Sequence, residues 1–309
     1  MAYQPNNSVE LTVSAGAATV AHLSRSAAVY RGNFHWCMKE STSYPQLVEA
    51  IQAIGLANSI VCLHSSLKSF GYLEGGADTL VRAFLDEGCT LVVPTFTYAC
   101  EAAPPPDRQL AQNGLDYSEP VALADVELYD KNATLISPEM GAVPARVLHL
   151  KGHVRSNHPL NSFGAIGPLA DELIRTQSLL NVYGPLQAMS THPATYMVLI
   201  GVDLTKATPI HFAEEKAGRR LFRRWAKLMD GEVHEVAVGS CSEGFNNLAP
   251  AVKELEINLM VGQSEWRVYP FRAFIDTVTR MIVRHPDITH CANVNCVRCN
   301  DAIKGGPRL

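Results

Sequence analysis

Short apolar runs alternate along the chain with segments whose apolar residues recur at helical spacing. Runs at 59–64, 90–94 and 195–202 have the length and the continuous apolar character of buried strands. Segments 77–87 and 208–217 show a helical pattern, and each follows a polar loop that comes after a strand. This order of strand, loop, helix and strand predicts an α/β fold, with a mainly parallel central sheet flanked by helices in a single large domain.

The remaining pattern adds further elements on either side of these strands. A helix is expected from Ser43 to Gly55, and short helices are expected at 137–151, 168–176 and 185–189. In the C-terminal third, segment 221–238 has the pattern of a hairpin with its turn at Asp230–Gly231. Segments 245–255 and 271–283 are helical in pattern, and a strand-like run at 266–269 separates them.

Three regions of the chain lack the regular pattern or differ in composition. Residues 1–42 have no firm period, and we expect an N-terminal extension that packs on the domain through Phe34 and Trp36 or takes part in a homo-oligomer. The domain itself is predicted to cover 43–285, and a Cys-rich tail follows at 286–309. Residues 101–129 are acidic, Pro-rich and aperiodic, which is typical of a functional or mobile loop.

Composition and charge narrow the classes of function. Of the 309 residues, 47% are hydrophobic and 18% are charged, as in globular proteins. A net charge of -4 gives no basic surface for nucleic acid. No apolar run reaches the roughly 18 residues of a membrane span, and the N-terminus lacks the pattern of a secretory signal. We therefore expect a cytoplasmic protein that binds neither nucleic acid nor membrane.

A histidine near the middle of the chain has a setting that suits proton transfer. His158 lies between Asn157 and Pro159, and the proline biases it away from helical geometry. Histidine readily takes up and returns a proton near neutral pH. A hydrogen-bonded surface histidine in a loop is the alternative interpretation.

Four blocks occur in an order and spacing that resemble a known family. They are His64–Gly71 with Gly75–Gly76, Pro94–Thr97, Arg155–Phe163 and Ile210–Glu214. Together they resemble the antibiotic N-acetyltransferase family, the aminoglycoside 3-N-acetyltransferases, over roughly residues 43–285. The resemblance implies a cytoplasmic acyltransferase, connected with antibiotic resistance, that uses acetyl-coenzyme A to acetylate a small-molecule amine.

The same resemblance implies roles for individual residues. It makes His158 the general base and Glu214 the carboxylate that orients it or gathers the cationic substrate, through direct attack of the amine on the thioester. The loop after the first strand would lie along the coenzyme, where hydroxyl and backbone donors suit its amides and pyrophosphate. The residues assigned to coenzyme are Ser65, Ser66, Ser69, Gly71, Thr95 and Thr97, with Lys68 as a phosphate contact. A second group near substrate is His211, Asn157 and Arg155.

Other interpretations of these blocks stay open at this point. The serines and glycines are also typical of a turn between strand and helix, and the two threonines of strand-end packing. The three-residue spacing of His211 and Glu214 is also typical of an ordinary side-chain pair on one face of a helix. The long loop does not follow the family pattern, so its acids are either solvated or part of an acidic substrate side. Both an aminoglycoside and another amine therefore remain open as the substrate.

The end of the chain carries a separate signal. Cys291, Cys296 and Cys299 follow His285, and together they offer four ligands for a structural zinc ion. A tail of reduced thiols or a local disulfide is the alternative, because only one C-x-x-C pair is present. A non-catalytic, zinc-dependent binding module on the same fold is the alternative function. The other five cysteines are scattered, and reduced thiols are expected there.

Overall fold

A seven-stranded sheet with the order β4-β5-β2-β1-β6-β10-β9 organises the computed structural model, which describes residues 41–118 and 126–309. The strands are β1 (Ile60–Ser65), β2 (Thr90–Pro94), β4 (Val154–Arg155), β5 (Phe163–Ile166), β6 (Thr195–Ile200), β9 (Ile257–Val261) and β10 (Ser264–Pro270). Residues 1–40 of the predicted N-terminal extension, 1–42, lie outside the described residues. The boundaries predicted at 43 and 286 stay predictions.

The directions of the strands follow from their pairings. Strand β1 pairs in parallel with β2 and β6, so these three form the centre of the sheet. The pairs β2–β5, β5–β4, β6–β10 and β10–β9 are antiparallel. Five strands (β4, β2, β1, β6 and β9) therefore run in one direction and two (β5 and β10) in the other, which confirms a mainly parallel α/β sheet flanked by helices.

Helices cover both faces of this sheet. One face packs against α1 (Tyr44–Ala53), α2 (Gly76–Asp86) and α3 (Ala142–Leu148); the other packs against α4 (Ala170–Ile174), α5 (Gly184–Met189), α6 (Pro209–Lys216), α7 (Ala249–Val252) and α8 (Phe271–Arg284). Alternation along β1 divides its side chains between the two cores: Ile60 and Cys62 join the second, whereas Val61 and Leu63 join the first. The buried, continuously apolar strands are thus explained by helices on both sides.

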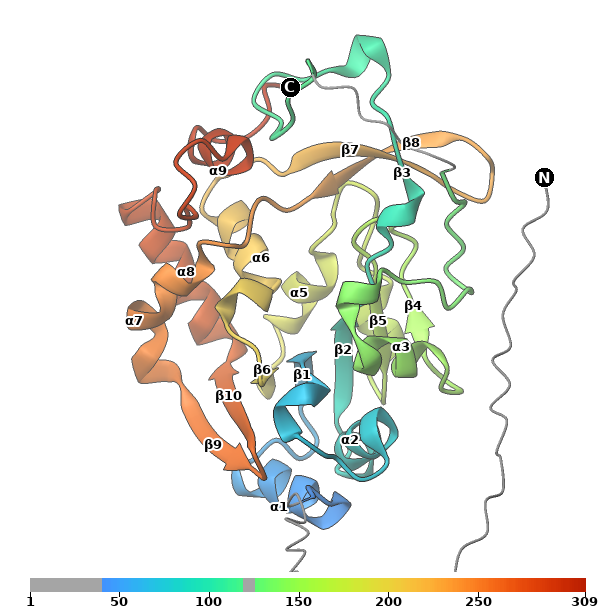
Figure 1. The fold of residues 1–309 in the computed structure, drawn as a ribbon, viewed down its shortest axis with the longest axis vertical. Helices are drawn as coiled ribbons and strands as arrows, with labels where there is room; N and C mark the ends of the chain where they lie inside the picture. The colour runs from blue at the N-terminus through green and yellow to red at the C-terminus, as the bar shows by residue number, and fades with distance from the viewer. Residues whose placement is uncertain (1–40, 119–125) are drawn as a thin grey trace, which may run out of the picture. The chain divides into compact units, whose positions relative to one another are not determined.

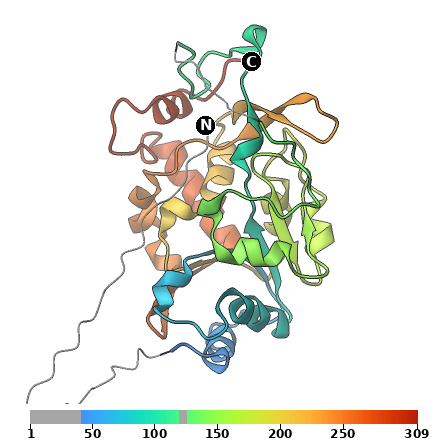
Figure 2. The same ribbon diagram turned by 45° about the vertical axis from the view of Figure 1, so that its right-hand side comes forward.

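A smaller sheet lies beyond the carboxyl ends of the three central strands (Figures 1 and 2). It has the order β3-β7-β8, made of β3 (Glu101–Ala102) and the predicted hairpin, β7 (Phe222–Lys227) with β8 (Val233–Val238). A third apolar cluster joins this sheet to Leu160 and to Ala302 of α9 (Val297–Ile303). The Cys-rich segment therefore packs on the domain through its helix.

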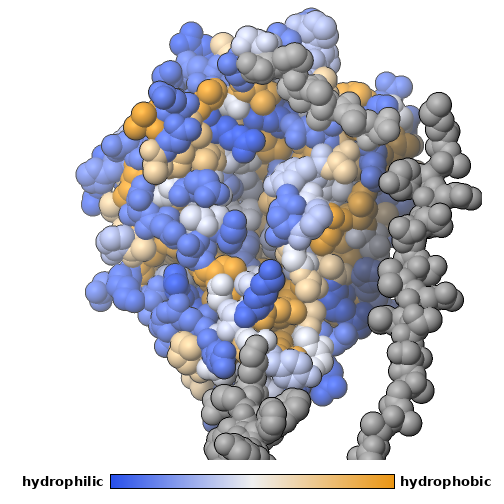
Figure 3. Space-filling model, viewed as in Figure 1, coloured by the Kyte–Doolittle hydropathy of each residue, from blue (hydrophilic) through white to orange (hydrophobic). Residues whose placement is uncertain are grey.

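The edge strands and the long loop differ most from the sequence pattern. Strands β4, β5 and β9 were not predicted; the first two are two and four residues long, and β9 is largely exposed. The described parts of the long loop include the short strand β3 and the 3-10 turn Pro106–Arg108, and another 3-10 turn, Tyr98–Cys100, directly precedes the loop. Among the described residues, none of the helices has the length and apolar character of a membrane span. The face in Figure 3 is mostly hydrophilic, with hydrophobic side chains in smaller patches.

Candidate active site

A cavity of about 800 Å³ opens where the central strands end and the smaller sheet begins. Its wall includes Ser65 at the end of β1 and Pro94 at the end of β2, as expected for a ligand site in an open α/β sheet. The volume lies within the range of cavities that hold a cofactor or substrate. The polar side chains that line it are His64, Ser65, Ser66, Lys68, Tyr98, Glu101, Glu139, Asn161, Thr205, Lys206, Thr208, His211, Arg224, Ser240, Cys241, Ser242, Glu243 and Arg298.

One histidine in this wall is paired with a buried carboxylate. His211 and Glu214 both lie on α6, three residues apart, and His211 Nδ1 is 2.8 Å from Glu214 Oε2. A carboxylate accepts hydrogen bonds, so Nδ1 carries the proton and Nε2 is left with its lone pair. This arrangement suits a general base whose tautomer is fixed by a carboxylate.

The carboxylate of Glu214 has further partners on both oxygens. Ser240 Oγ donates to Oε2 at 2.7 Å, and Arg219 Nη1 donates to Oε1 at 2.5 Å. Burial alone would raise the pKa of Glu214, but the hydrogen bonds from His211 and Ser240 and the charges of His211 and Arg219 lower it below its ordinary value. Glu214 is therefore held ionised, and its charge can stabilise a protonated His211.

Two aromatic rings and a glycine fix the position of the His211 ring. Tyr183 stacks on it with ring centroids 6.4 Å apart, and Phe245 meets it edge-on at 4.8 Å. A Cβ at Gly239 would lie 2.6 Å from His211 Cγ, so the absence of a side chain there makes room for the imidazole. The ring has little freedom to leave Glu214.

His158 has a different environment from the one its sequence setting suggests. Its side chain is fully buried and is not among the residues that line the cavity. Nε2 donates to the Ala237 carbonyl at 3.0 Å, and Nδ1 accepts from the Asn161 backbone N–H at 2.9 Å. Burial lowers the pKa of His158 to about 4. With both ring nitrogens bound to backbone, His158 ties its loop to β8, and the geometry favours His211 over His158 as the base.

The residues assigned to the coenzyme loop divide into two groups. Ser65, Ser66 and Lys68 line the cavity. Ser69 does not, because its hydroxyl donates to the Ser66 carbonyl at 2.7 Å and meets the Ser264 hydroxyl at 2.6 Å. Gly71 also lies away from the cavity lining; it has a φ of +66°, which permits the turn that ends the 3-10 helix Leu67–Phe70.

Thr95 and Thr97, which were predicted to bind coenzyme, are not among the residues that line the cavity. The cavity is lined instead by the alternate residues Pro94, Phe96 and Tyr98. Thr95 is fully buried and its hydroxyl meets that of Ser162 at 2.8 Å, while Thr97 Oγ1 accepts from Arg155 at 2.7 Å. Both hydroxyls are engaged inside the protein.

Arg155 and Asn157 are likewise absent from the cavity lining. Arg155 is buried and donates to three backbone carbonyls, those of Thr95, Ala133 and Leu135. Its guanidinium also lies over the Tyr129 ring. Asn157 is exposed. Arg155 therefore organises the loops beneath the site rather than contacting a ligand there.

The model of the family described as aminoglycoside 3-N-acetyltransferase matches residues 62–283. The chain belongs to this aminoglycoside 3-N-acetyltransferase family. The family predicted from the four sequence blocks is thus confirmed, and the chain is an acyltransferase of the aminoglycoside N3-acetyltransferase type.

Individual relatives agree with this assignment. The chain is 24% identical to the aminoglycoside N(3')-acetyltransferase-like protein YokD of Bacillus subtilis, over 80% of this chain and 96% of YokD. It is 28% identical to aminoglycoside N(3)-acetyltransferase VIII of Streptomyces fradiae, over 58% of this chain and 69% of that protein. Its fold is similar to that of aminoglycoside acetyltransferase AAC(3)-IVa, with a TM-score of 0.70 at 24% identity over 87% of this chain and 99% of the other.

Charged residues of both signs line the cavity where it meets the smaller sheet. Arg224 of β7 lies 3.5 Å from Glu101 of β3, and burial lowers the pKa of Arg224 to about 10. Burial raises the pKa of Glu101, and the charges of Arg224 and Arg298 oppose that shift. Of the acids in the long loop, Glu101 lines the cavity; Glu119 and Asp125 lie outside the described residues.

Several cavity residues were not found from the sequence. His64 lines the cavity beside the coenzyme loop, and burial lowers its pKa to about 4. Arg224, Ser240 and Arg298 come from the hairpin, the segment after it and the C-terminus. Of these four residues only His64 belongs to one of the four sequence blocks. The sequence pattern therefore gave no indication that Arg224, Ser240 or Arg298 lines the cavity.

The cysteines of the C-terminal segment meet a fourth cysteine. The Sγ atoms of Cys241, Cys291, Cys296 and Cys299 all lie within 4.8 Å of one another. His285, the fourth ligand expected from the sequence, is exposed and is not part of this group. The group of converging thiols therefore differs from the predicted ligand set, because it contains Cys241 and not His285.

Proposed function

We propose that this chain transfers an acetyl group from acetyl-coenzyme A to an amine of an aminoglycoside, with His211 as the general base and Glu214 as its partner. The observation that carries the proposal is the hydrogen bond between His211 Nδ1 and Glu214 in the cavity wall, with no hydrogen-bond partner for Nε2 among the described residues. An ammonium has no lone pair, so the substrate amine must lose a proton before or during its attack. His158, with both ring nitrogens bound to backbone, is not suited to accept that proton.

The cavity fits acetyl-coenzyme A at the end formed by β1 and β6. Ser65 and Ser66 offer hydroxyl donors there, and Lys68 and Lys206 offer two exposed ammonium groups for phosphate. When bound, acetyl-coenzyme A supplies the thioester carbonyl and its thiol is the leaving group. One structural neighbour, of 18% identity, is described as AAC-IIIb binary with CoASH. Coenzyme binding at these residues is therefore part of the proposal.

The residues of the pair each have a defined task. His211 Nε2 takes the proton from the attacking amine, and the same proton is available to the departing thiolate. Ionised Glu214 holds Nδ1–H and stabilises the imidazolium formed in between. Arg219 and Ser240 keep the carboxylate oriented and charged.

A second class of amine substrate is favoured by one observation. Arg224 and Arg298 line the same cavity as Glu101, Glu139 and Glu243. The acids suit the ammonium groups of an aminoglycoside, and two solved neighbours are described as complexes with a gentamicin and with apramycin. The two arginines instead suit an amine that also carries a carboxylate or phosphate. A non-catalytic binding module has no comparable support, since it needs no oriented base.

Free-thiol release from acetyl-coenzyme A, measured with both substrate classes, tests this function. Wild-type protein should release thiol with an aminoglycoside and form an acetylated product of matching mass. His211→Ala should lose about a hundredfold or more in kcat, whereas His158→Asn should retain most of it if folded. An inactive but folded His158→Asn beside an active His211→Ala would overturn the assignment of the base. No turnover with any amine would overturn the reaction.

A further inference from the structure

We propose that Cys241, Cys291, Cys296 and Cys299 form a structural zinc site that fastens the C-terminal arm, residues 286–303, to the wall of the active-site cavity. Four sulfur atoms within 4.8 Å of one another match a closed tetrahedral set. A Zn–S distance of about 2.3 Å places such sulfurs about 3.8 Å apart, so a small contraction completes the site. With four thiolates the ion has no open position, which makes its role structural.

The arrangement of the ligands favours a metal over a disulfide. All four thiols are free in the structure, and they converge on one point instead of forming separate pairs. Cys296 immediately precedes α9 and Cys299 lies in its first turn, so both sulfurs share one side of the helix. The Cys291 backbone N–H also donates to Cys299 Sγ at 3.4 Å. Each thiol that binds the ion as thiolate releases its proton to solvent.

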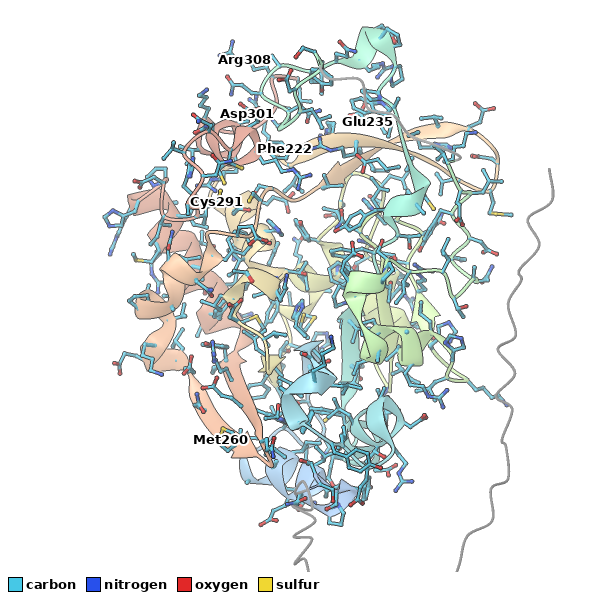
Figure 4. All side chains as sticks on the ribbon, in the orientation of Figure 1. Phe222, Glu235, Met260, Cys291, Asp301 and Arg308 are labelled. Carbon is cyan, nitrogen blue, oxygen red and sulfur yellow. The ribbon has the colours of Figure 1, made fainter. Side chains whose placement is uncertain are left out.

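Contacts outside the cluster show that the arm and the Cys241 segment are built to meet. A Cβ at Gly244 would lie 2.4 Å from the carbonyl oxygens of both Thr289 and His290, so a glycine is needed for this approach. Asn247 Nδ2 donates to the carbonyls of Ile288 and His290 at 3.1 and 3.2 Å. Figure 4 shows Cys291 and Asp301 on the arm beside β7, which carries Phe222. The metal site closes an interface that is already complementary.

The two segments joined by the metal also hold the Glu214 carboxylate, the proposed partner of His211. On the cavity side, Ser240 precedes Cys241 and donates to Glu214. On the arm side, Arg219 donates to Glu214 as well as to Thr289 Oγ1 and to the Pro286 carbonyl. Arg298, between Cys296 and Cys299, lines the cavity itself. The zinc site is therefore a positioning device for the Glu214 network and for Arg298, and its ligand Cys241 itself lies in the cavity wall.

Metal analysis of the full chain tests the site independently of acetyl transfer. Purified protein should contain about one zinc per chain by elemental mass spectrometry. Replacement by Co²⁺ should give the visible absorption of a tetrahedral ion with thiolate-to-cobalt charge transfer. Cys241→Ser should lose most of the metal and this spectrum. His285→Ala, the matched control at the position first expected to bind, should keep both.

Hydrogen exchange measures the coupling between the metal and the cavity. In Cys241→Ser, amides of 286–303 and 239–244 should exchange faster, while those of β1 and β2 stay protected. Cys241→His keeps a possible ligand and should restore most of the metal and the protection, which separates metal loss from misfolding. Because metal content is the first readout, failure of the proposed acetyl transfer would leave this result intact.

Each remaining outcome would overturn the proposal. Metal-free protein with four titratable thiols, a disulfide between any two of these cysteines by mass spectrometry, or iron in place of zinc would contradict the zinc site. Full zinc content in Cys241→Ser would remove Cys241 as a ligand. Unchanged exchange at 239–244 in the metal-free variant would contradict the link to the cavity wall.

Discussion

His211 Nδ1 lies 2.8 Å from Glu214 Oε2, and the other carboxylate oxygen of Glu214 lies 2.5 Å from Arg219 Nη1. The buried carboxylate therefore sits between a histidine that faces the cavity and an arginine that faces the C-terminal arm. An ion this deeply buried is stable only because each oxygen has charged or hydroxyl partners. Substitutions that alter the partners of either oxygen of Glu214 should consequently affect the position and protonation of His211, the proposed base.

Glu214→Gln should lower kcat by about a hundredfold or more, because a neutral amide neither fixes the same tautomer nor stabilises the imidazolium. The change keeps the size of the side chain, and KM for acetyl-coenzyme A should stay within about threefold. Steady-state kinetics by thiol release checks this. Glu215→Gln, on the next position of α6, is the matched control and should retain kcat. Equal losses in both variants would contradict the role given to Glu214.

His158 should make folding stability depend on pH. Its pKa in the folded state is about 4 against an ordinary 6.5, so below pH 6.5 the unfolded chain binds a proton that the native chain does not. The free energy of unfolding should therefore fall as the pH drops from 6.5 to 4, by about 3 kcal/mol from this residue. Denaturant melts of wild type and His158→Asn across this range measure the difference.

In His158→Asn the free energy of unfolding should fall by about 3 kcal/mol less between pH 6.5 and pH 4 than it does in the wild type, because the titrating imidazole is gone. His64 is buried with a pKa of about 4 as well, so His64→Asn is the control that removes a second contribution of the same sign. An unchanged pH dependence in His158→Asn would mean that His158 is hydrated and protonatable, which would reopen its candidacy as the base.

The order of the central strands and helices could be predicted from the sequence because the central strands are buried on both faces. Continuous apolar runs at β1, β2 and β6 carry that signal directly, and the α/β class follows from the helices between them. Strands β4 and β5 are too short for a period, and Asn258 interrupts the apolar residues of β9, which is five residues long. These three outer strands, of which β4 and β9 form the edges of the sheet, depend on pairing with neighbours, which a local pattern does not contain.

The contact between His211 and Glu214 could be predicted because one sequence block contained both residues. His211 and Glu214 lie three residues apart, so their contact follows from helix geometry. His158 was predicted from neighbours that fit a catalytic loop, whereas its contacts with the Ala237 carbonyl of β8 and with the Asn161 N–H come from the folded structure. The place of Cys241 in the cysteine cluster could not be predicted for a similar reason. Nothing in its local sequence indicates that the C-terminal arm, about fifty residues later, folds onto it.

Gly239→Ala should impair the base without removing it. The added Cβ would lie 2.6 Å from both His211 Cγ and the Tyr183 hydroxyl, so the imidazole must shift away from its place beside Glu214. A displacement of this kind should lower kcat by about tenfold or more. Thiol-release kinetics and calorimetry of coenzyme A binding are the measurements. Gly231→Ala, in the hairpin turn, is a control for lost stability alone and should keep kcat.

Glu101→Gln should weaken binding of a polycationic amine more than it slows the reaction. Glu101 lines the cavity near Arg224 and Arg298, and its carboxylate is the acid of the long loop placed to meet an ammonium group. Loss of one such ion pair should raise the amine KM by about five- to tenfold at low salt, and less at high salt. Asp107→Asn, exposed in the same loop and outside the cavity, is the matched control. The opposite result would be a lower KM for an aminoglycoside in Glu101→Gln, with a still larger decrease in KM for an amine that carries a carboxylate or phosphate. In that case Arg224 and Arg298, and not Glu101, select the substrate, and an anionic amine replaces the aminoglycoside as the proposed substrate.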